Sequence, residues 1–232
     1  MKKQTLLNLT ALGAVLLCGS ALAQNMTVRL GVANVDPNSN ASAIRGPFTP
    51  ANALSLEVQP QTTLYASLSR AIDDNWNVEL ALGAPPTHDV TVVVLKPDAV
   101  TPSVVAANGQ VGAKIRQIAP TLFLNYAFGA KSNAFRPFVG IGVNYSAFDK
   151  RESTAINDAV NGGPTHIKLK SSLGLAAQVG VIYQFNPVWS VSASLATAAV
   201  KTQETTNTLG IIRMADIDFK PAVFALAVGY TF

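Results

Sequence analysis

The chain has 232 residues and a formal net charge of +4, with 49% hydrophobic and only 13% charged residues. Its Lys and Arg residues are scattered, so the basic balance does not favour nucleic-acid binding. Beyond the first 23 residues, no apolar run approaches the roughly 18 residues that a transmembrane helix needs. The one cysteine, Cys18, lies within those first residues, so no disulfide is available to stabilise the rest of the chain.

The N-terminal residues have the pattern of a secretory signal peptide. Lys2 and Lys3 are basic, residues 6–17 are mostly apolar, and a small-residue pair ends at Ala23. We therefore expect residues 1–23 to be removed and residues 24–232 to form the mature protein. A lipid anchor on Cys18 is the alternative, but Leu17 stands where a small residue is expected before a lipidated cysteine.

Eight segments of the mature chain alternate with a period of two, which is typical of β-strands. One face of each segment carries large apolar residues, and the other carries mostly Gly, Ala, Ser and Asn. The segments lie near residues 26–35, 62–71, 76–83, 121–128, 139–146, 173–183, 189–195 and 224–232. An exported, apolar chain with eight such strands predicts an all-β fold, an eight-stranded antiparallel transmembrane β-barrel.

The connections between these segments alternate in length. Those at 72–75, 129–134 and 186–188 are short, whereas those near 36–60, 86–112, 149–167 and 202–216 are long. Outer-membrane barrels have short periplasmic turns, long extracellular loops and aromatic girdles at both interfaces. The aromatic residues beside the short turns fit one girdle: Trp76, Phe128, Phe135, Phe185, Trp189 and Phe232. A soluble lipocalin-like barrel is the alternative, but its outer face would have to be polar.

Several stretches, in order along the chain, resemble the outer membrane protein W (OmpW) family. They include Val32-Ala-Asn-Val-Asp-Pro-Asn-Ser39 and Phe135-Arg-Pro-Phe-Val-Gly-Ile-Gly-Val-Asn-Tyr145, with residues 74–80, 119–122, 126–129, 173–180 and 228–232. The resemblance covers nearly all of the mature chain but not residues 92–112 or 150–167. It implies an eight-stranded outer-membrane barrel with a narrow, partly apolar lumen that passes small hydrophobic molecules.

Catalysis finds little support in the sequence. His88 and His166 both lie in or beside predicted loops, and neither has metal-ligand spacing to another ligand type. A lipid-modifying barrel enzyme would need a Ser or carboxylate set beside a histidine, and Ser171 and Ser172 are near His166 only in sequence. We expect no catalytic residue, no metal and no cofactor.

Three charged residues fall on the inward face near the periplasmic end of the predicted barrel: Arg29, Glu79 and Arg136. A charge inside a narrow barrel is desolvated unless it is paired. The sequence therefore predicts a cluster in which Glu79 lies between the two arginines and closes the floor of the lumen. The alternative is that one or more of these side chains faces periplasmic water.

Towards the outer end the inward positions become apolar, with Val35, Phe148, Val200, Phe219 and Val223 near the rim. An apolar rim is unlike a water-filled porin and fits a pocket for a small hydrophobic molecule. Such solutes would enter from outside and, above a closed floor, leave sideways into the outer-membrane lipid. A packed apolar plug without ligand is one alternative; a structural or adhesive barrel acting through its loops is another.

The last predicted strand has a continuous outward stripe of Phe224, Leu226, Val228, Tyr230 and Phe232. Closing the barrel requires this strand to pair with the first one, around Val28 to Val32. Its alternating aromatic end also resembles the signal by which the barrel-assembly machinery recognises its clients. We expect this stripe to act in assembly as well as in contact with lipid.

Overall fold

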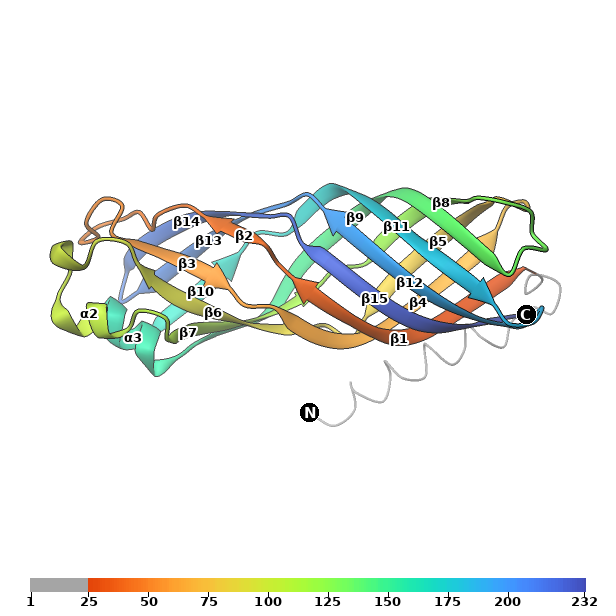
Figure 1. Ribbon diagram of the computed structural model, residues 1–232. Coiled ribbons are helices and arrows are strands. Elements are labelled where there is room, and N and C mark those ends of the chain that lie inside the picture. Colours follow the sequence, from red (N-terminus) through yellow and green to blue (C-terminus); the bar gives the residue numbers. More distant parts are fainter. Residues whose placement is uncertain (1–24) are drawn as a thin grey trace, which may run out of the picture.

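The computed structural model describes residues 25–232, and it is an elongated molecule with a barrel at one end. The predicted signal peptide and its cleavage site lie outside the described residues. Eight antiparallel strands close the barrel, because β1 pairs with both β4 and β15 and β11 pairs with both β9 and β12 (Figure 1). These strands are β1 (Met26–Asp36), β4 (Gln61–Ala71), β5 (Trp76–Gly83), β8 (Thr121–Ala127), β9 (Phe135–Ser153), β11 (Ser172–Gln184), β12 (Trp189–Ala198) and β15 (Ala222–Thr231).

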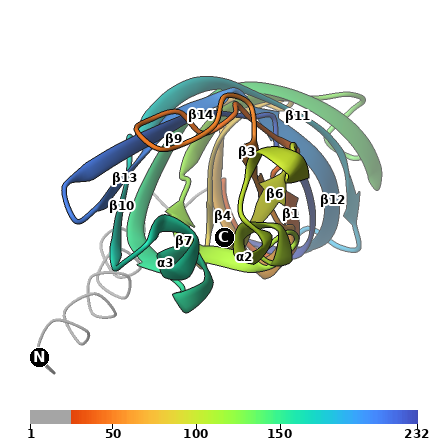
Figure 2. The same cartoon turned by 90° about the vertical axis from the view of Figure 1, so that its left-hand side faces the viewer.

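The four long connections are present, but they are largely regular structure. They form an extension that continues the barrel away from the short turns and carries the short helices at its tip (Figures 1 and 2). Its elements are β2 (Ser39–Ala41), β3 (Leu54–Val58), β6 (Thr87–Val94), η1 (Pro97–Ala99), α2 (Pro102–Ala106), β7 (Val111–Ile118), α3 (Ala155–Asn161), β10 (Thr165–Leu169), β13 (Val200–Thr208) and β14 (Ile211–Phe219).

Two groups of strands build this extension. β3, β6 and β7 join the end of β9, which runs on from the barrel wall, and β10, β13, β14 and β2 form a separate four-stranded sheet. The buried faces of both groups contribute to one apolar core, which includes Val90, Ile115, Phe148, Val200 and Phe219. None of the helices among residues 25–232 is long and apolar enough to cross a membrane.

The faces of the barrel strands follow the predicted alternation. On β15, Phe224, Leu226, Val228 and Tyr230 are exposed while Ala225 and Ala227 are buried, and Val32 of β1 lies opposite Leu226. The predicted closure of the last strand on the first is therefore confirmed. Because the outward side chains are large and apolar and the closed barrel pairs its strands with one another, the wall can face hydrocarbon without exposing unpaired backbone groups.

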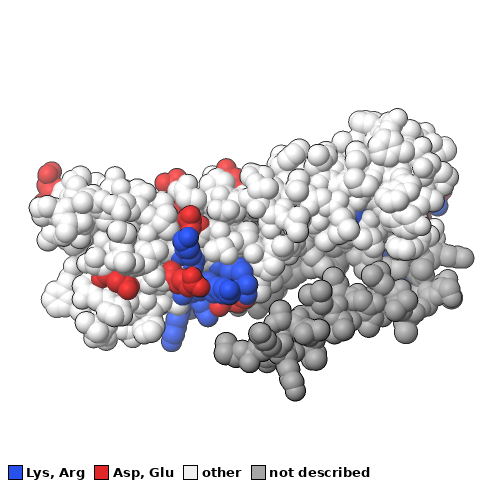
Figure 3. Space-filling view, turned by 90° about the horizontal axis from the view of Figure 1, so that it is seen from below, with Lys and Arg blue, Asp and Glu red and all other residues white. Residues whose placement is uncertain are grey.

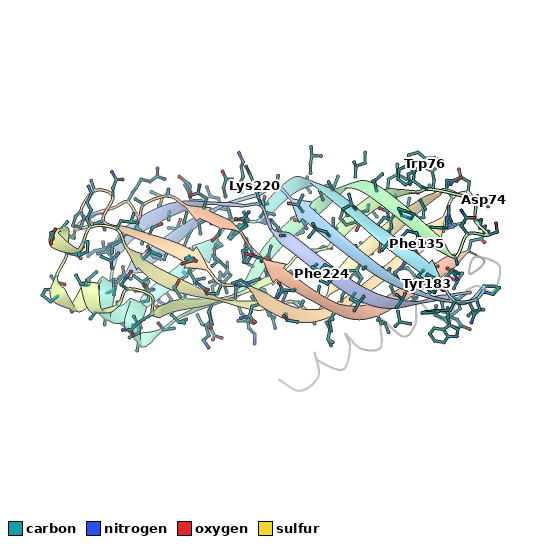
Figure 4. The ribbon with its side chains drawn as sticks, in the orientation of Figure 1. Asp74, Trp76, Phe135, Tyr183, Lys220 and Phe224 are labelled. Atoms are coloured by element: carbon teal, nitrogen blue, oxygen red, sulfur yellow. The ribbon has the colours of Figure 1, made fainter. Side chains whose placement is uncertain are left out.

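Aromatic side chains gather near the short turns, where Figure 4 labels Trp76, Phe135 and Tyr183. Ring centroids lie 5.0 Å apart for Trp189 and Tyr230 and 4.9 Å apart for Tyr230 and Phe232, in edge-to-face geometry. At the other end of the wall, charged side chains form a band where barrel and extension meet (Figure 3). An apolar wall between an aromatic ring and a charged band is the arrangement expected of a membrane barrel.

Candidate functional site

A network of polar side chains crosses the inside of the barrel around Glu79 of β5. Its carboxylate accepts hydrogen bonds from Tyr65 Oη at 3.1 Å, Asn125 Nδ2 at 2.8 Å and Gln178 Nε2 at 3.1 Å. Arg29 Nη1 lies 3.6 Å from Glu79 Oε1, so the two charges are paired. Glu79 is only 4% exposed. A buried carboxylate requires this number of partners, because each unmatched lone pair would cost free energy.

The network depends on a glycine in the neighbouring strand. A Cβ placed on Gly140 of β9 would lie 2.0 Å from Asn125 Oδ1 and 3.0 Å from Gln178 Cγ. The missing side chain therefore makes room for Gln178 Nε2 to donate to Asn125 Oδ1 at 2.7 Å. Side chains from β1, β4, β8 and β11 contact the Glu79 carboxylate of β5, so five of the eight barrel strands meet in this layer.

Arg136 does not join this cluster, so the expected position of Glu79 between two arginines is wrong. Arg136 Nη2 donates instead to backbone carbonyl oxygens at the short turns, at 2.6 Å to Asp74 and 3.3 Å to Gly129. Arg136 is the second residue of β9 and lies beside the short turns that supply these carbonyl oxygens. These oxygens satisfy the guanidinium without a counter-charge.

Above the network lies a cavity of about 140 Å³. Three residues of the predicted apolar rim line it: Val35, Val200 and Val223. The other two, Phe148 and Phe219, are buried in the apolar core of the extension, together with Val200. The predicted rim is thus divided between the wall of a cavity and the packed layer that covers it on the side of the extension.

One side of the cavity reaches the outer surface of the barrel. Leu64 and Leu82 point away from the lumen and are 67% and 40% exposed, yet both line the cavity together with inward residues such as Ala33 and Tyr65. Residues from both faces of the wall therefore border the cavity on this side.

The hydrogen-bond ladder is interrupted where the cavity meets the wall. Pairing of β5 with β8 ends at Ala81 and Thr121, and backbone contact resumes where Gln117 N donates to the Pro86 carbonyl oxygen at 3.0 Å, followed by the pair Thr87 of β6 and Arg116 of β7. The interrupted stretch contains Pro85, Pro86 and Pro120, which have no backbone N–H to donate. We call residues 82–86 and 117–120 the wall gap.

The two histidines form no catalytic set with each other. His88 Nδ1 is 2.8 Å from the Gln59 carbonyl oxygen, its Nε2 is buried without a partner, and burial lowers the pKa of this imidazole. His166 is exposed on β10, in the other sheet of the extension. Among residues 25–232, no three His, Cys, Asp or Glu side chains are grouped so that they could hold a metal ion.

Sequence reasoning named Arg29 and Glu79 but missed their neutral partners. Asn125 and Gln178 are polar residues in the inward phase of otherwise small or apolar strands, and that position was the available signal. The wall gap also had a signal, since proline is rare inside a paired strand.

A barrel of eight closed strands with an apolar outer wall agrees with the comparisons with known proteins. The model of the OmpW family matches residues 23–232. This chain belongs to the OmpW family. It is 29% identical over 232 residues to outer membrane protein W of Vibrio cholerae serotype O1, with 99% of this chain and 100% of that protein covered. OmpW-family proteins of this kind are outer-membrane barrels, and the outer-membrane location of this chain follows.

Two further relatives are similar over most of their length. The crystal structure of outer membrane protein OprG from Pseudomonas aeruginosa superposes with a TM-score of 0.77 at 29% identity, covering 90% of this chain and 96% of that chain. The dibenzothiophene metabolism operon protein PahQ of Pseudomonas aeruginosa is 27% identical over 208 residues, 89% of this chain and 88% of that protein.

Proposed function

We propose that this OmpW-family barrel is a conduit that carries small hydrophobic molecules from outside the cell into the outer-membrane lipid. The observation that carries the proposal is the cavity beside the wall gap, where the backbone pairing of the barrel strands is interrupted. The network around Glu79 closes the lumen below it. A solute in the cavity would leave through the wall at this gap rather than along the barrel axis.

The proposed orientation places the extension outside the cell and the short turns in the periplasm. Both chain ends of the barrel lie at the short-turn end, where Asn25 N donates to the Phe232 carbonyl oxygen at 3.3 Å. Long connections on the outer side are the usual arrangement in such barrels. A solute would therefore meet the extension first and reach the cavity after displacing the apolar layer of Phe148 and Phe219.

The size and lining of the cavity set the class of solute. A dry apolar cavity of about 150 Å³ accommodates a benzene-sized molecule. Most of the upper lining is Ala, Val and Pro, whereas Gln117, Thr121, Asn144 and Ser146 place polar groups on one side. The relative named for an operon of dibenzothiophene metabolism fits the expectation of small aromatic solutes.

Uptake measurements test the proposal directly. We expect a strain that lacks this protein to take up labelled naphthalene several-fold more slowly than the same strain carrying the wild-type chain. Uptake of a small sugar should be the same in both strains, because the floor blocks a continuous water path. Equal naphthalene uptake in the two strains would contradict the proposal.

A second candidate function is attachment through the extension. Phe48, in the connection between β2 and β3, is 87% exposed, and Leu209, between β13 and β14, is also exposed. Large apolar side chains presented on loops are typical of binding surfaces. The variants Phe48→Ser and Leu209→Ser should lose attachment to host or phage surfaces without loss of naphthalene uptake if this function is the correct one.

We also propose that the lipid-facing stripe of β15 is recognised by the barrel-assembly machinery. β15 pairs with β12 on one side and with β1 on the other, so it forms the last seam of the barrel. Until that seam closes, β15 presents an unpaired edge and an apolar stripe to a partner.

A further inference from the structure

A second pocket, far from the barrel cavity, lies at the tip of the extension. Its volume is about 420 Å³, within the range usual for small-molecule sites. All four long connections contribute to it, with Phe48 from the first, Val104 of α2 from the second, Asn161 of α3 from the third and Arg213 of β14 from the fourth. The short helices α2 and α3, which contribute to it, are at the end of the molecule furthest from the short turns (Figure 1).

Arg213 is a buried cation without a counter-charge at this pocket. The residue is 9% exposed, and its guanidinium donates from Nε to Thr49 Oγ1 at 3.0 Å and from Nη1 to Asn161 Oδ1 at 3.1 Å. Both acceptors are neutral. Nη2 has no hydrogen-bond partner among residues 25–232, and no carboxylate of these residues makes an ion pair with Arg213.

Three other arginines of the described chain have carboxylate partners. Arg45 pairs with Asp216 at 2.5 Å, Arg116 pairs with Asp149, and Arg29 pairs with Glu79. A largely buried cation is destabilising unless an anion or hydrogen-bond acceptors compensate it. Asp98 also lines the pocket, but it is exposed and not in ion-pair contact with Arg213. The free donor of Arg213 is therefore available to an anion from outside.

The remaining walls of the pocket are mainly apolar, with Leu54, Leu56, Val92, Val104 and Val160 among them. A free phosphate or sulfate would match the guanidinium but not these walls. A neutral hydrocarbon would match the walls but leave the charge unpaired. A ligand with an apolar body and a single negative charge satisfies both.

We propose that the tip pocket binds small amphipathic carboxylates, with the carboxylate accepting from Arg213 and the hydrocarbon body against the apolar walls. A guanidinium binds a carboxylate through charge-assisted hydrogen bonds, which are stronger than those it makes to the neutral oxygens of Thr49 and Asn161. A role for this pocket at the start of the solute path rests on the proposed function. The binding of a carboxylate at Arg213 does not depend on it.

Calorimetry on the full chain in lipid nanodiscs tests the proposal, with heats from empty nanodiscs subtracted. Octanoate is the probe and 1-octanol is its neutral match. We expect octanoate to bind at least tenfold more tightly than 1-octanol, and Arg213→Met to remove that difference. Arg45→Met is the matched control and should bind octanoate as the wild type does, because the Arg45 guanidinium is exposed and already paired. Asp98→Asn should tighten octanoate binding two- to threefold, because it removes the negative charge that also lines the pocket.

Arg213→Met also removes the hydrogen bonds to Thr49 and Asn161, so it could disturb the local fold. A second variant therefore separates loss of binding from loss of local structure. Val104→Trp fills the pocket from α2 and leaves the contacts of Arg213 in place, and it should abolish octanoate binding while the barrel keeps its folded mobility on a gel. Equal affinity for octanoate and 1-octanol would overturn the proposal, as would unchanged octanoate binding in both variants. Tighter binding of octyl phosphate than of octanoate would overturn the assignment to carboxylates.

Octanoate binding and naphthalene uptake, measured together, distinguish the pocket at the tip from the conduit. Octanoate binding in nanodiscs together with unchanged naphthalene uptake in the deletion strain would refute the conduit and leave the pocket standing. Loss of naphthalene uptake in the deletion strain, without octanoate binding, would refute the pocket and leave the conduit standing.

Discussion

Arg29 Nη1 and Glu79 Oε1 lie 3.6 Å apart inside the barrel, and both residues are buried. The pair joins β1 to β5 across β4, so it connects strands that are not direct neighbours. Tyr65, Asn125 and Gln178 complete the hydrogen bonds of the carboxylate. This pair is therefore the centre of the layer that closes the lumen.

Removing one member of the pair should destabilise the folded barrel. Glu79→Gln leaves the Arg29 guanidinium buried without a counter-charge, which typically costs about 3–5 kcal/mol. We expect a lower temperature for the shift from folded to unfolded mobility on a denaturing gel. The double variant Arg29→Met with Glu79→Leu should recover much of the loss, since no isolated charge remains. Asp74→Asn, at an exposed turn, is the control and should leave that temperature unchanged.

A methyl group on Gly140 of β9 should disturb the hydrogen-bond network around Glu79. The added Cβ would fall 2.0 Å from Asn125 Oδ1, so Asn125 or the backbone of β9 must move. We expect Gly140→Ala to lower the gel-shift temperature by an amount similar to that for Glu79→Gln. Gly163→Ala, whose nearest neighbour is the flexible end of Leu209 at 3.0 Å, should have a small effect. Equal effects of the two substitutions would contradict a tight fit at Gly140.

The stability of the extension should depend on pH through Glu204. Burial raises the pKa of the Glu204 carboxyl to about 7, from its ordinary value of 4.5. Between these values the folded chain keeps the proton and the unfolded chain releases it, so the free energy of unfolding falls as pH rises, by on the order of 3 kcal/mol. We expect the urea midpoint for protease cleavage within β13 to be higher at pH 5 than at pH 8.

The variant Glu204→Gln should remove most of this difference between pH 5 and pH 8. Asp218→Asn, which changes an exposed carboxylate on the adjacent strand β14, is the control and should retain it. A pH dependence that persists in Glu204→Gln would show that another group is responsible.

The aromatic stripe of β15 should matter more for assembly than for the finished barrel. Phe232 is exposed, and its ring packs against Tyr230 with centroids 4.9 Å apart. We expect Phe232→Ala to slow insertion in a pulse–chase experiment several-fold, with a change of only about 1 kcal/mol in the stability of the inserted barrel. Normal insertion kinetics would refute a role in recognition.

The barrel could be predicted from the sequence because its physical pattern is simple. Lipid outside and a narrow lumen inside force a strict period of two, and the expected strand at 76–83 coincides with β5. The extension could not be predicted in the same way. In β6, Val90, Thr91 and Val92 are all buried, because the register with β7 shifts between Val90 and Thr91 and interrupts the alternation.

The charged cluster inside the barrel was predictable in part, because a charged residue at an inward position stands out against small and apolar neighbours. Arg29 and Glu79 were identifiable because charges at inward positions must find each other. Arg136 was misplaced because its partners are backbone carbonyl oxygens, which have no sequence signature. The tip pocket could not be predicted, since Arg213 and Val104 come together only through the packing of separate connections.

Blocking the wall gap is the most direct test of lateral release into the membrane. Ala119 lies in the gap and lines the cavity, so Ala119→Trp should fill the opening. Ala177→Trp places the same side chain on the lipid-facing wall away from the gap and is the matched control. We predict that Ala119→Trp reduces naphthalene uptake to the level of the strain without the protein, while Ala177→Trp retains wild-type uptake at equal membrane abundance. Wild-type uptake in Ala119→Trp would contradict passage through this wall.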